Sequence, residues 1–218
     1  MPRKAQHTIV NYNKEDHEAT NASDGMKEHW QVAVKHAQAA YEKVILSARR
    51  LVEINQSISQ GSNGDLRSLI QEKQALELDL EVLPFEAGHA LYQAVIARLK
   101  YLKAEDQRIQ EWERRVMEDD EQNSDKSEEE SESIEAFITT QNAILQAKKE
   151  LQQVIAEARL TSGYWRFEDW RNEDLWEAYA NQLQTSRIKV ATNARNHVLQ
   201  GTYGVVKDPH LEACTYRE

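Results

Sequence analysis

The sequence predicts an all-α protein, an antiparallel coiled-coil or helical-hairpin bundle of about five helices with an extended N-terminal arm and C-terminal tail. Turn formers are scarce in the 218-residue chain, which has only 7 Gly and 3 Pro. Residues that favour helices, mainly Ala, Gln, Glu, Leu and Lys, are abundant. Apolar residues recur at alternating steps of three and four, the spacing of one face of a helix.

The first 23 residues predict a flexible arm. They are mostly polar, and too few apolar side chains are present to form a core. Ile9, Val10 and Tyr12 are grouped as a small hydrophobic patch. We expect this patch to anchor the arm on a partner protein.

Residues 24–117 predict a helical hairpin whose first helix begins near Asp24, a suitable N-cap residue. The apolar positions of this helix form a heptad seam, with Asn55 at its next position. The seam residues are Trp30, Val34, Ala37, Tyr41, Val44, Ala48 and Leu51. The stretch 60–65 contains two Gly and an Asn and predicts the turn, after which Asp65 can cap the next helix.

A second and a third helix complete this hairpin. The second is expected to end or kink at Leu83, because the residue before Pro84 disfavours the helical conformation. The third spans 85–117, and Gly88 indicates a close crossing with another helix. The second helix has the stripe Leu66, Leu69, Leu76, Leu80 and Leu83, and the third has Tyr92, Val95, Leu99, Leu102, Ile109 and Val116.

Residues 118–133 predict an acidic, disordered linker. Between Glu118 and Glu135 there are ten acidic residues and one Lys, a charge of −9 within the chain's total of −10. Self-repulsion and the lack of apolar residues oppose folding of such a segment. The rest of the chain is therefore nearly neutral.

Residues 134–200 predict a second helical hairpin, and residues 201–218 an extended tail. The apolar stripe of the first helix in this second hairpin is Ile134, Phe137, Ile138, Leu145, Leu151, Ile155 and Ala158. Asn172 is a suitable cap for the following helix, which ends at the stretch 201–204. The stripe of this last helix is Trp176, Tyr179, Leu183, Val190, Ala194 and His197.

An aromatic stretch connects the two helices of the second hairpin. Trp165, Phe167 and Trp170 are large rings in a short connection, and we expect them to pack on the bundle and to contact a partner. Acidic residues beside aromatic rings also occur in glycosidase clefts. Here the carboxylates are consecutive residues around a helix start, which does not favour a rigid catalytic cleft.

No catalytic, cofactor-binding or metal-binding residues are expected. The sequence has no nucleophile elbow, glycine-rich phosphate loop or HExxH motif. Its single cysteine, Cys214, cannot form an internal disulfide. The seven histidines include no pair at a spacing of four.

These features predict a non-enzymatic helical subunit that assembles with other protein chains in a larger intracellular complex, as a homo- or hetero-oligomer. A phage or viral structural or assembly protein, such as a scaffold or head–tail adaptor, is the first alternative. A helical nucleic-acid-binding protein is the second, because Arg187, Lys189 and Arg195 follow one another on the last helix without an acidic residue. No apolar run reaches the roughly 18 residues of a spanning helix, so we expect no membrane partner and a cytoplasmic, nuclear or virion location.

Overall fold

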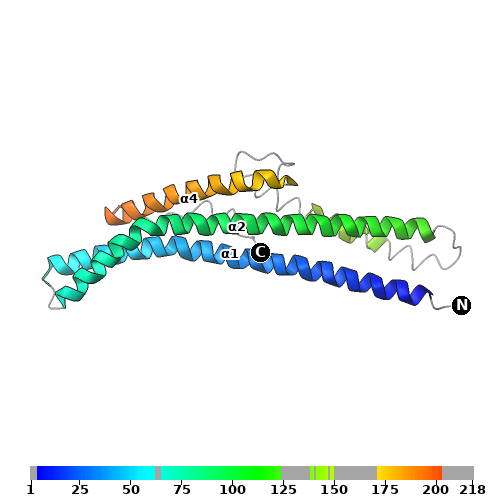
Figure 1. Cartoon of the computed structure of the whole chain (residues 1–218), viewed down its shortest axis with the longest axis horizontal. Helices are drawn as coiled ribbons and strands as arrows, with labels where there is room; N and C mark the ends of the chain where they lie inside the picture. The colour runs from blue at the N-terminus through cyan, green and yellow to red at the C-terminus, as the bar shows by residue number, and fades with distance from the viewer. Residues whose placement is uncertain are drawn as a thin grey trace. The chain divides into compact units, whose positions relative to one another are not determined.

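The computed structural model describes residues 4–61, 65–123 and 171–202, together with 138–139, 141–146 and 148–149. Side chains are described from Ser23 onward in the first helix and up to Glu118 in the second. The elements are α1 (Lys4–Ser59), α2 (Leu66–Asn123), the short 3-10 helix η2 (Glu173–Leu175) and α4 (Trp176–Leu199) (Figure 1). Throughout the described residues, all regular structure is helical, which confirms the all-α prediction. The helices themselves differ from those expected, because α2 takes the place of two.

The chain groups into two compact units. The first contains residues 1–29 and 98–171, and the second contains residues 30–97 and 172–218. Both α1 and α2 contribute residues to each unit. The grouping does not follow the order of the chain, and the division into hairpins at 24–117 and 134–200 stays a prediction.

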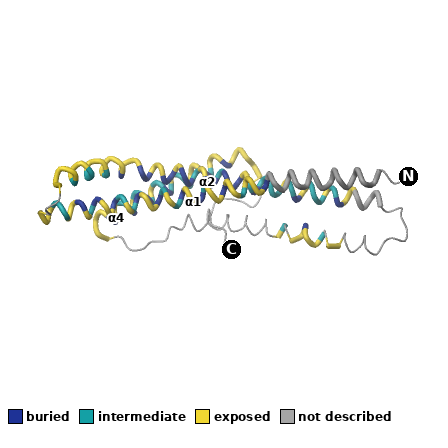
Figure 2. Tube along the Cα trace, turned by 90° about the horizontal axis from the view of Figure 1, so that it is seen from below, coloured by how far each residue is buried: buried dark blue, intermediate teal, exposed yellow. Residues whose placement is uncertain are grey.

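In the second unit, parts of α1, α2 and α4 surround one apolar core. Ion pairs between Lys43 and Glu86 (3.6 Å) and between Arg50 and Glu72 (2.7 Å) show that α1 and α2 are antiparallel here. Buried residues lie on the sides of the helices that face one another (Figure 2). The core comprises Tyr41, Val44, Ala48, Leu51, Leu80, Leu83, Ala87, Ala191, Ala194 and Val198.

The predicted seam of α1 is confirmed, since all seven of its apolar residues are buried. The prediction for the next position is wrong: Asn55 is exposed, and Ile54 is buried instead, with an exposed fraction of 1%. Burial of the Ile54 side chain is favourable. A buried Asn side chain would need hydrogen-bond partners in the core.

Pro84 lies inside α2, which continues from Leu66 to Asn123, so of the two outcomes predicted at Leu83 the helix end is wrong and the kink is the compatible one. A proline has no N–H group, so the carbonyl oxygen of Leu80, four residues earlier, loses its usual helical donor. The guanidinium of Arg195 in α4 donates a hydrogen bond to this oxygen, at 2.8 Å. The orphaned acceptor is thereby satisfied, and α2 bends but continues (Figure 1).

The close crossing predicted at Gly88 is present between α2 and α4. A Cβ atom at this position would lie 2.5 Å from Cγ1 of Ile188 and 3.0 Å from the carbonyl oxygen of Gln184. Any larger residue would therefore push the two helices apart. The glycine lets the backbones approach more closely than side chains allow.

Asn172 caps the short helix η2 that precedes α4, whereas the N-cap of α4 itself, Leu175, makes no side-chain hydrogen bond; the C-terminal end of α4 follows the predicted chemistry. Asn172 accepts a hydrogen bond from the backbone N–H of Asp174 (3.1 Å) at the start of η2. Gly201 has a φ of 71°, and its N–H bonds to the carbonyl of Val198, while that of Thr202 bonds to His197. These are the two hydrogen bonds of a Schellman motif.

The face of α4 that enters the core is rotated relative to the predicted stripe. Tyr179, Leu183 and Val190 are only half-buried, and His197 is exposed. The buried residues are Trp176, Ala180, Arg187, Ala191, Ala194 and Val198. Small alanines occupy this face, and they permit a close approach of helices that large side chains would prevent. The guanidinium of the fully buried Arg187 lies over the ring of Tyr41, 4.8 Å from its centroid.

The core of the first unit is a smaller cluster along α2. It comprises Leu102, Ile109, Val116 and Ile144, with the half-buried Tyr101 and Trp112 beside them. In the described part of 138–149, Ile144 is the inward residue, whereas Ile138 and Leu145 are 51% and 53% exposed. The prediction that these two residues lie on the inward face is therefore wrong. An ion pair between Lys148 and Glu113 adds a contact to α2.

The helices of the predicted first hairpin extend further than expected, α1 at its N-terminal end and α2 at its C-terminal end. Helix α1 begins at Lys4 and not near Asp24, so residues 4–23 are helical and do not form an unstructured arm. No Gly or Pro interrupts this stretch, and polar composition alone does not break a helix. Helix α2 likewise runs to Asn123, into the predicted acidic linker. Residues 124–133 of the linker and 203–218 of the tail lie outside the described residues.

Candidate interaction surface

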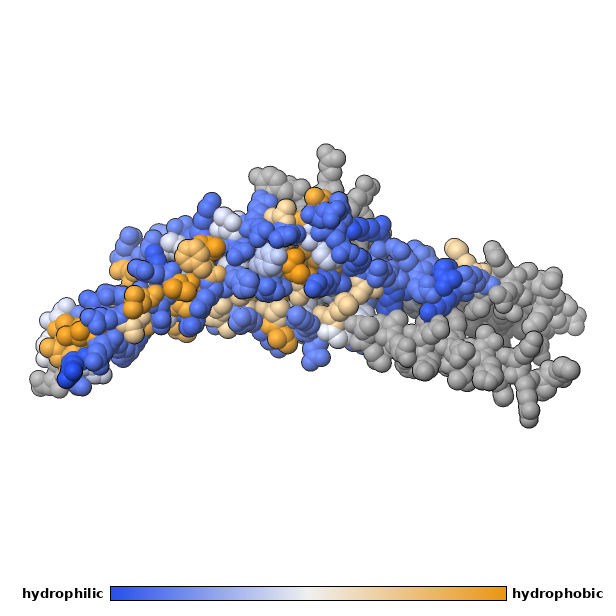
Figure 3. All heavy atoms as spheres, viewed as in Figure 1, coloured by the Kyte–Doolittle hydropathy of each residue, from blue (hydrophilic) through white to orange (hydrophobic). Residues whose placement is uncertain are grey.

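A row of exposed apolar side chains follows α2 in the second unit. Leu78, Val82 and Phe85, which we call the outer stripe, are spaced at steps of four and three, so they share one helical face. Their exposed fractions are 68%, 54% and 59%. Figure 3 shows hydrophobic side chains gathered on the visible surface over the first part of α2.

The opposite face of the same stretch is the one that enters the core. Leu80, Leu83 and Ala87 have exposed fractions of 3%, 2% and 0%. Successive residues of a helix are rotated by about 100° around its axis, so a residue two positions further along the chain lies on nearly the opposite side. This stretch of α2 is therefore apolar on two faces, and the outer stripe is not used to hold the unit together.

Two rings extend the outer stripe toward the C-terminal end of α2. His89 and Tyr92 follow Phe85 at steps of four and three. Their rings are stacked nearly parallel, at an interplanar angle of 6° and a centroid distance of 6.1 Å. His89 is exposed and Tyr92 half-buried. The apolar row thus covers about four helical turns.

The charged residues that α2 itself places beside the outer stripe are all acidic. Residues 74–97 include four acidic residues and no Lys or Arg. Glu77 pairs with Lys73 (3.7 Å), and Glu86 pairs with Lys43. Asp79 and Glu81 have no ion-pair partner within the described part of the chain. Carboxylates therefore flank the apolar row on both sides.

A polar cluster in the first unit surrounds Glu105. The carboxylate accepts hydrogen bonds from the Ser23 hydroxyl (2.6 Å) and the Arg108 guanidinium (2.6 Å). Burial alone would raise the pKa of Glu105, but these hydrogen bonds outweigh it and hold the pKa below its ordinary value. The guanidinium of Arg108 also lies over the ring of Trp112, 5.9 Å from its centroid. The cluster ties α1 to α2 within this unit.

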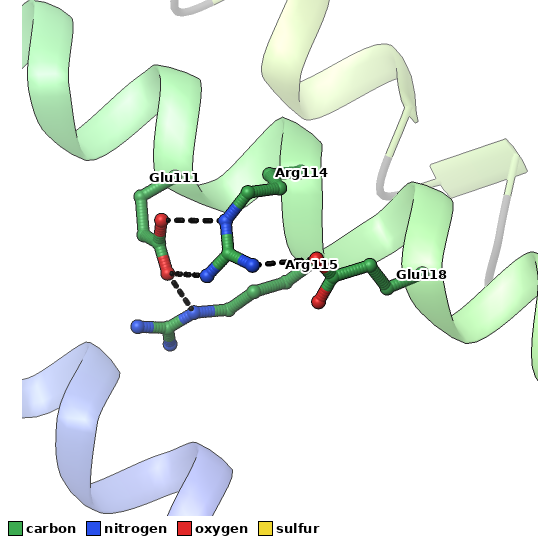
Figure 4. A network of polar contacts seen from close by, with 4 residues as sticks. All are labelled: Glu111, Arg114, Arg115 and Glu118. Atoms are coloured by element: carbon green, nitrogen blue, oxygen red, sulfur yellow. Dashed lines mark hydrogen bonds and ion pairs between the residues drawn. The ribbon is translucent and has the colours of Figure 1, made fainter.

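A second polar network lies further along α2 (Figure 4). Glu111 accepts hydrogen bonds from Arg114 (2.6 Å) and Arg115 (2.9 Å), which lower its pKa to about 2. Arg114 also pairs with Glu118, at 2.5 Å. A carboxylate held ionised in this way is a poor proton donor near neutral pH. The network neutralises the start of the acidic segment and suits a helix surface better than acid–base catalysis.

The residues predicted to bind a partner are not tested by the structure. The backbone of Ile9, Val10 and Tyr12 belongs to α1, and their side chains lie outside the described residues. Trp165, Phe167 and Trp170 lie outside the described residues altogether. Their roles therefore remain predictions.

Sequence reasoning missed the outer stripe although its spacing is visible. The stripe predicted for this stretch is a single apolar face, and an end or kink of the helix is predicted at Leu83, between Val82 and Phe85. A helix end there assigns these two residues to different helices. Continuity of α2 through Pro84 puts them on one face.

The basic residues expected on a nucleic-acid-binding helix do not form a common surface on α4. Arg187 is fully buried, and Arg195 bonds to the carbonyl of Leu80. Only Lys189 is exposed to solvent. Neutralising several phosphates requires several accessible cations, so this arrangement weakens the nucleic-acid alternative.

Within the described residues, no three His, Cys, Asp or Glu side chains are placed to hold a metal ion. None of the helices described is both long and apolar enough to cross a bilayer. Comparison of the chain with protein-family models, with curated proteins and with solved structures gives no match.

Proposed function

We propose that this chain is a non-enzymatic helical subunit that assembles with other protein chains in a larger complex. The observation that carries the proposal is the outer stripe, formed by Leu78, Val82 and Phe85. Each of these side chains is more than half exposed, and together they form a continuous row. Contiguous exposed apolar rows are typical of protein-binding surfaces, whereas isolated exposed apolar residues are common everywhere.

The arrangement of α2 supports this role in a second way. The inner face holds the helix in the core, so a partner can cover the outer face without unfolding the unit. A helix fixed by Gly88 and by the Arg195 hydrogen bond presents its outer residues in one geometry. Preorganisation of this kind reduces the entropic cost of binding.

The proposal is tested by recovery of the tagged chain from its own cells or virions, followed by identification of the bound proteins. In the stripe variant, Leu78, Val82 and Phe85 are each replaced by Ser. The matched control replaces Val32 and Leu46 by Ser, because these α1 residues are 60% and 61% exposed but isolated from one another. We expect the stripe variant to lose a partner that the wild type and the control retain.

Circular dichroism and thermal melting establish that both variants are folded. Substitutions at exposed positions usually change the free energy of unfolding by no more than about 0.5 kcal/mol each. Retention of every wild-type partner by a folded stripe variant would contradict the proposal.

A further inference from the structure

We propose that the outer stripe binds an amphipathic α-helix of another protein, one whose apolar row is flanked by Lys and Arg. This inference rests on the proposed function and adds the chemistry of the partner. It is carried by two observations taken together: the helical spacing of the apolar row and the acidic residues that α2 places beside it.

The spacing of the row fits a helix as the partner. Leu78, Val82, Phe85, His89 and Tyr92 alternate at steps of four and three. This is the spacing by which two helices pack along a shared seam. The row from Leu78 to Tyr92 is about 21 Å long at the helical rise of about 1.5 Å per residue. A partner helix of about four turns would cover it.

The flanking carboxylates favour a partner helix whose own flanking residues are positively charged. Asp79 and Glu81 lie on opposite sides of the row, because they are about 160° apart around the helix at about 100° per residue. Glu86 lies on the same side as Asp79. Positions beside a helical seam set partner choice through charge. Glu86 already pairs with Lys43, so Asp79 and Glu81 are the carboxylates that a helix with Lys or Arg at its flanking positions would meet.

A second copy of this chain does not fit the same surface. In a two-fold dimer, each patch meets an identical patch. Pairing through the outer stripe would therefore bring Asp79, Glu81 and Glu86 of one copy toward the same acidic residues of the other. Like charges across an interface disfavour that pairing.

The test is a fluorescence-anisotropy titration of the full-length chain with two designed peptides. Both are amphipathic helices of about four heptads with the same Leu and Ile seam. One has Lys at the flanking positions, and the other has Glu. The proteins compared are the wild type, the stripe variant with Ser at positions 78, 82 and 85, and the charge variant Asp79→Lys/Glu81→Lys.

We expect the wild type to bind the Lys peptide about tenfold more tightly than the Glu peptide, since each exposed charge pair changes affinity up to about fivefold. Added salt should weaken this preference. The charge variant should reverse the preference, and the stripe variant should bind neither peptide. Reversal by the charge variant shows that Asp79 and Glu81 set the sign, because the apolar row is unchanged.

Equal binding of the two peptides, or binding of neither, would overturn this inference. Self-association of the wild type that the stripe variant lacks, measured by sedimentation, would overturn it in favour of a second copy. These outcomes are distinct from failure of the proposed function. That failure is retention of every native partner by the stripe variant, and it is measured without the peptides.

Discussion

The hydrogen bond from Arg195 to the Leu80 carbonyl should contribute more to the free energy of unfolding when residue 84 is proline than when it is not. With proline at position 84, the Leu80 oxygen has no helical N–H donor, and the Arg195 guanidinium supplies one at 2.8 Å. The substitution Pro84→Ala restores the backbone N–H. Arg195 then becomes a second donor to an oxygen that is already satisfied.

The expected magnitude follows from the charge and exposure of this contact. A hydrogen bond from a charged donor contributes about 1.5–3 kcal/mol when it is well buried. This one is only partly buried, so we expect Arg195→Met to lower the free energy of unfolding by about 1–2 kcal/mol. In the Pro84→Ala background, the same substitution should cost about 0.5 kcal/mol or less, the range of ordinary surface changes.

The assay is a double-mutant cycle measured by urea unfolding, followed by circular dichroism. The wild type, both single variants and the double variant are compared, and the coupling energy is expected to be about 0.5–2 kcal/mol. Lys189→Met is the matched control, because Lys189 is an exposed basic residue on the same helix. An equal effect of Arg195→Met in both backgrounds would refute the account of how α2 continues through its proline.

Three further predictions concern stability. Gly88→Ala should lower the free energy of unfolding by up to about 2 kcal/mol, because overpacking costs about 1–3 kcal/mol and the gain in helix propensity is about 1 kcal/mol. A Cβ at Gly25 would have nothing within 4 Å, so Gly25→Ala should raise the free energy of unfolding. Urea unfolding of the two variants shows whether their effects are opposite in sign. Glu105→Gln should destabilise by about 1–2 kcal/mol at neutral pH. The pKa of Glu105 is depressed in the folded chain, so its contribution to stability is present above about pH 4.3 and is lost as pH falls through the folded-state pKa. A difference in melting temperature between variant and wild type that persists in acid would contradict this. Leu83→Ala should cost about 2–5 kcal/mol and Val82→Ala no more than about 0.5 kcal/mol, although the residues are adjacent; equal losses of melting temperature would show that the two faces of α2 are misassigned.

The parts of the fold that local chemistry determines could be predicted from the sequence. The seam of α1 was visible because each of its inward residues is apolar and correctly spaced. The cap at Asp65 was visible because its short carboxylate accepts a bond from the N–H of Arg67. The same holds for Asn172 and for the glycine after α4. Each of these features depends on residues only a few positions apart.

The parts that depend on distant residues could not be predicted. Pro84 stops most helices, and its compensation comes from Arg195, 111 positions later in the chain. The inward face of α4 consists largely of alanines, which give a weaker sequence signal than Leu183 or Val190. Their burial depends on how closely α4 approaches its neighbours, and Gly88 on another helix sets that distance. The outer stripe was hidden for the same reason, because recognising it requires a continuous α2.

The most direct test of the central claim, that the outer face of α2 is a protein-binding surface, is photo-crosslinking in the native cell or virion. A benzophenone amino acid replaces Phe85, which is 59% exposed in the outer stripe. The same amino acid at Leu46, which is 61% exposed on α1 and outside the outer stripe, is the control. The account predicts a discrete adduct from position 85 alone, joined to a different protein at an amphipathic helix rich in Lys and Arg. No adduct at position 85, the same adducts from both positions, or adducts within this chain alone would contradict it.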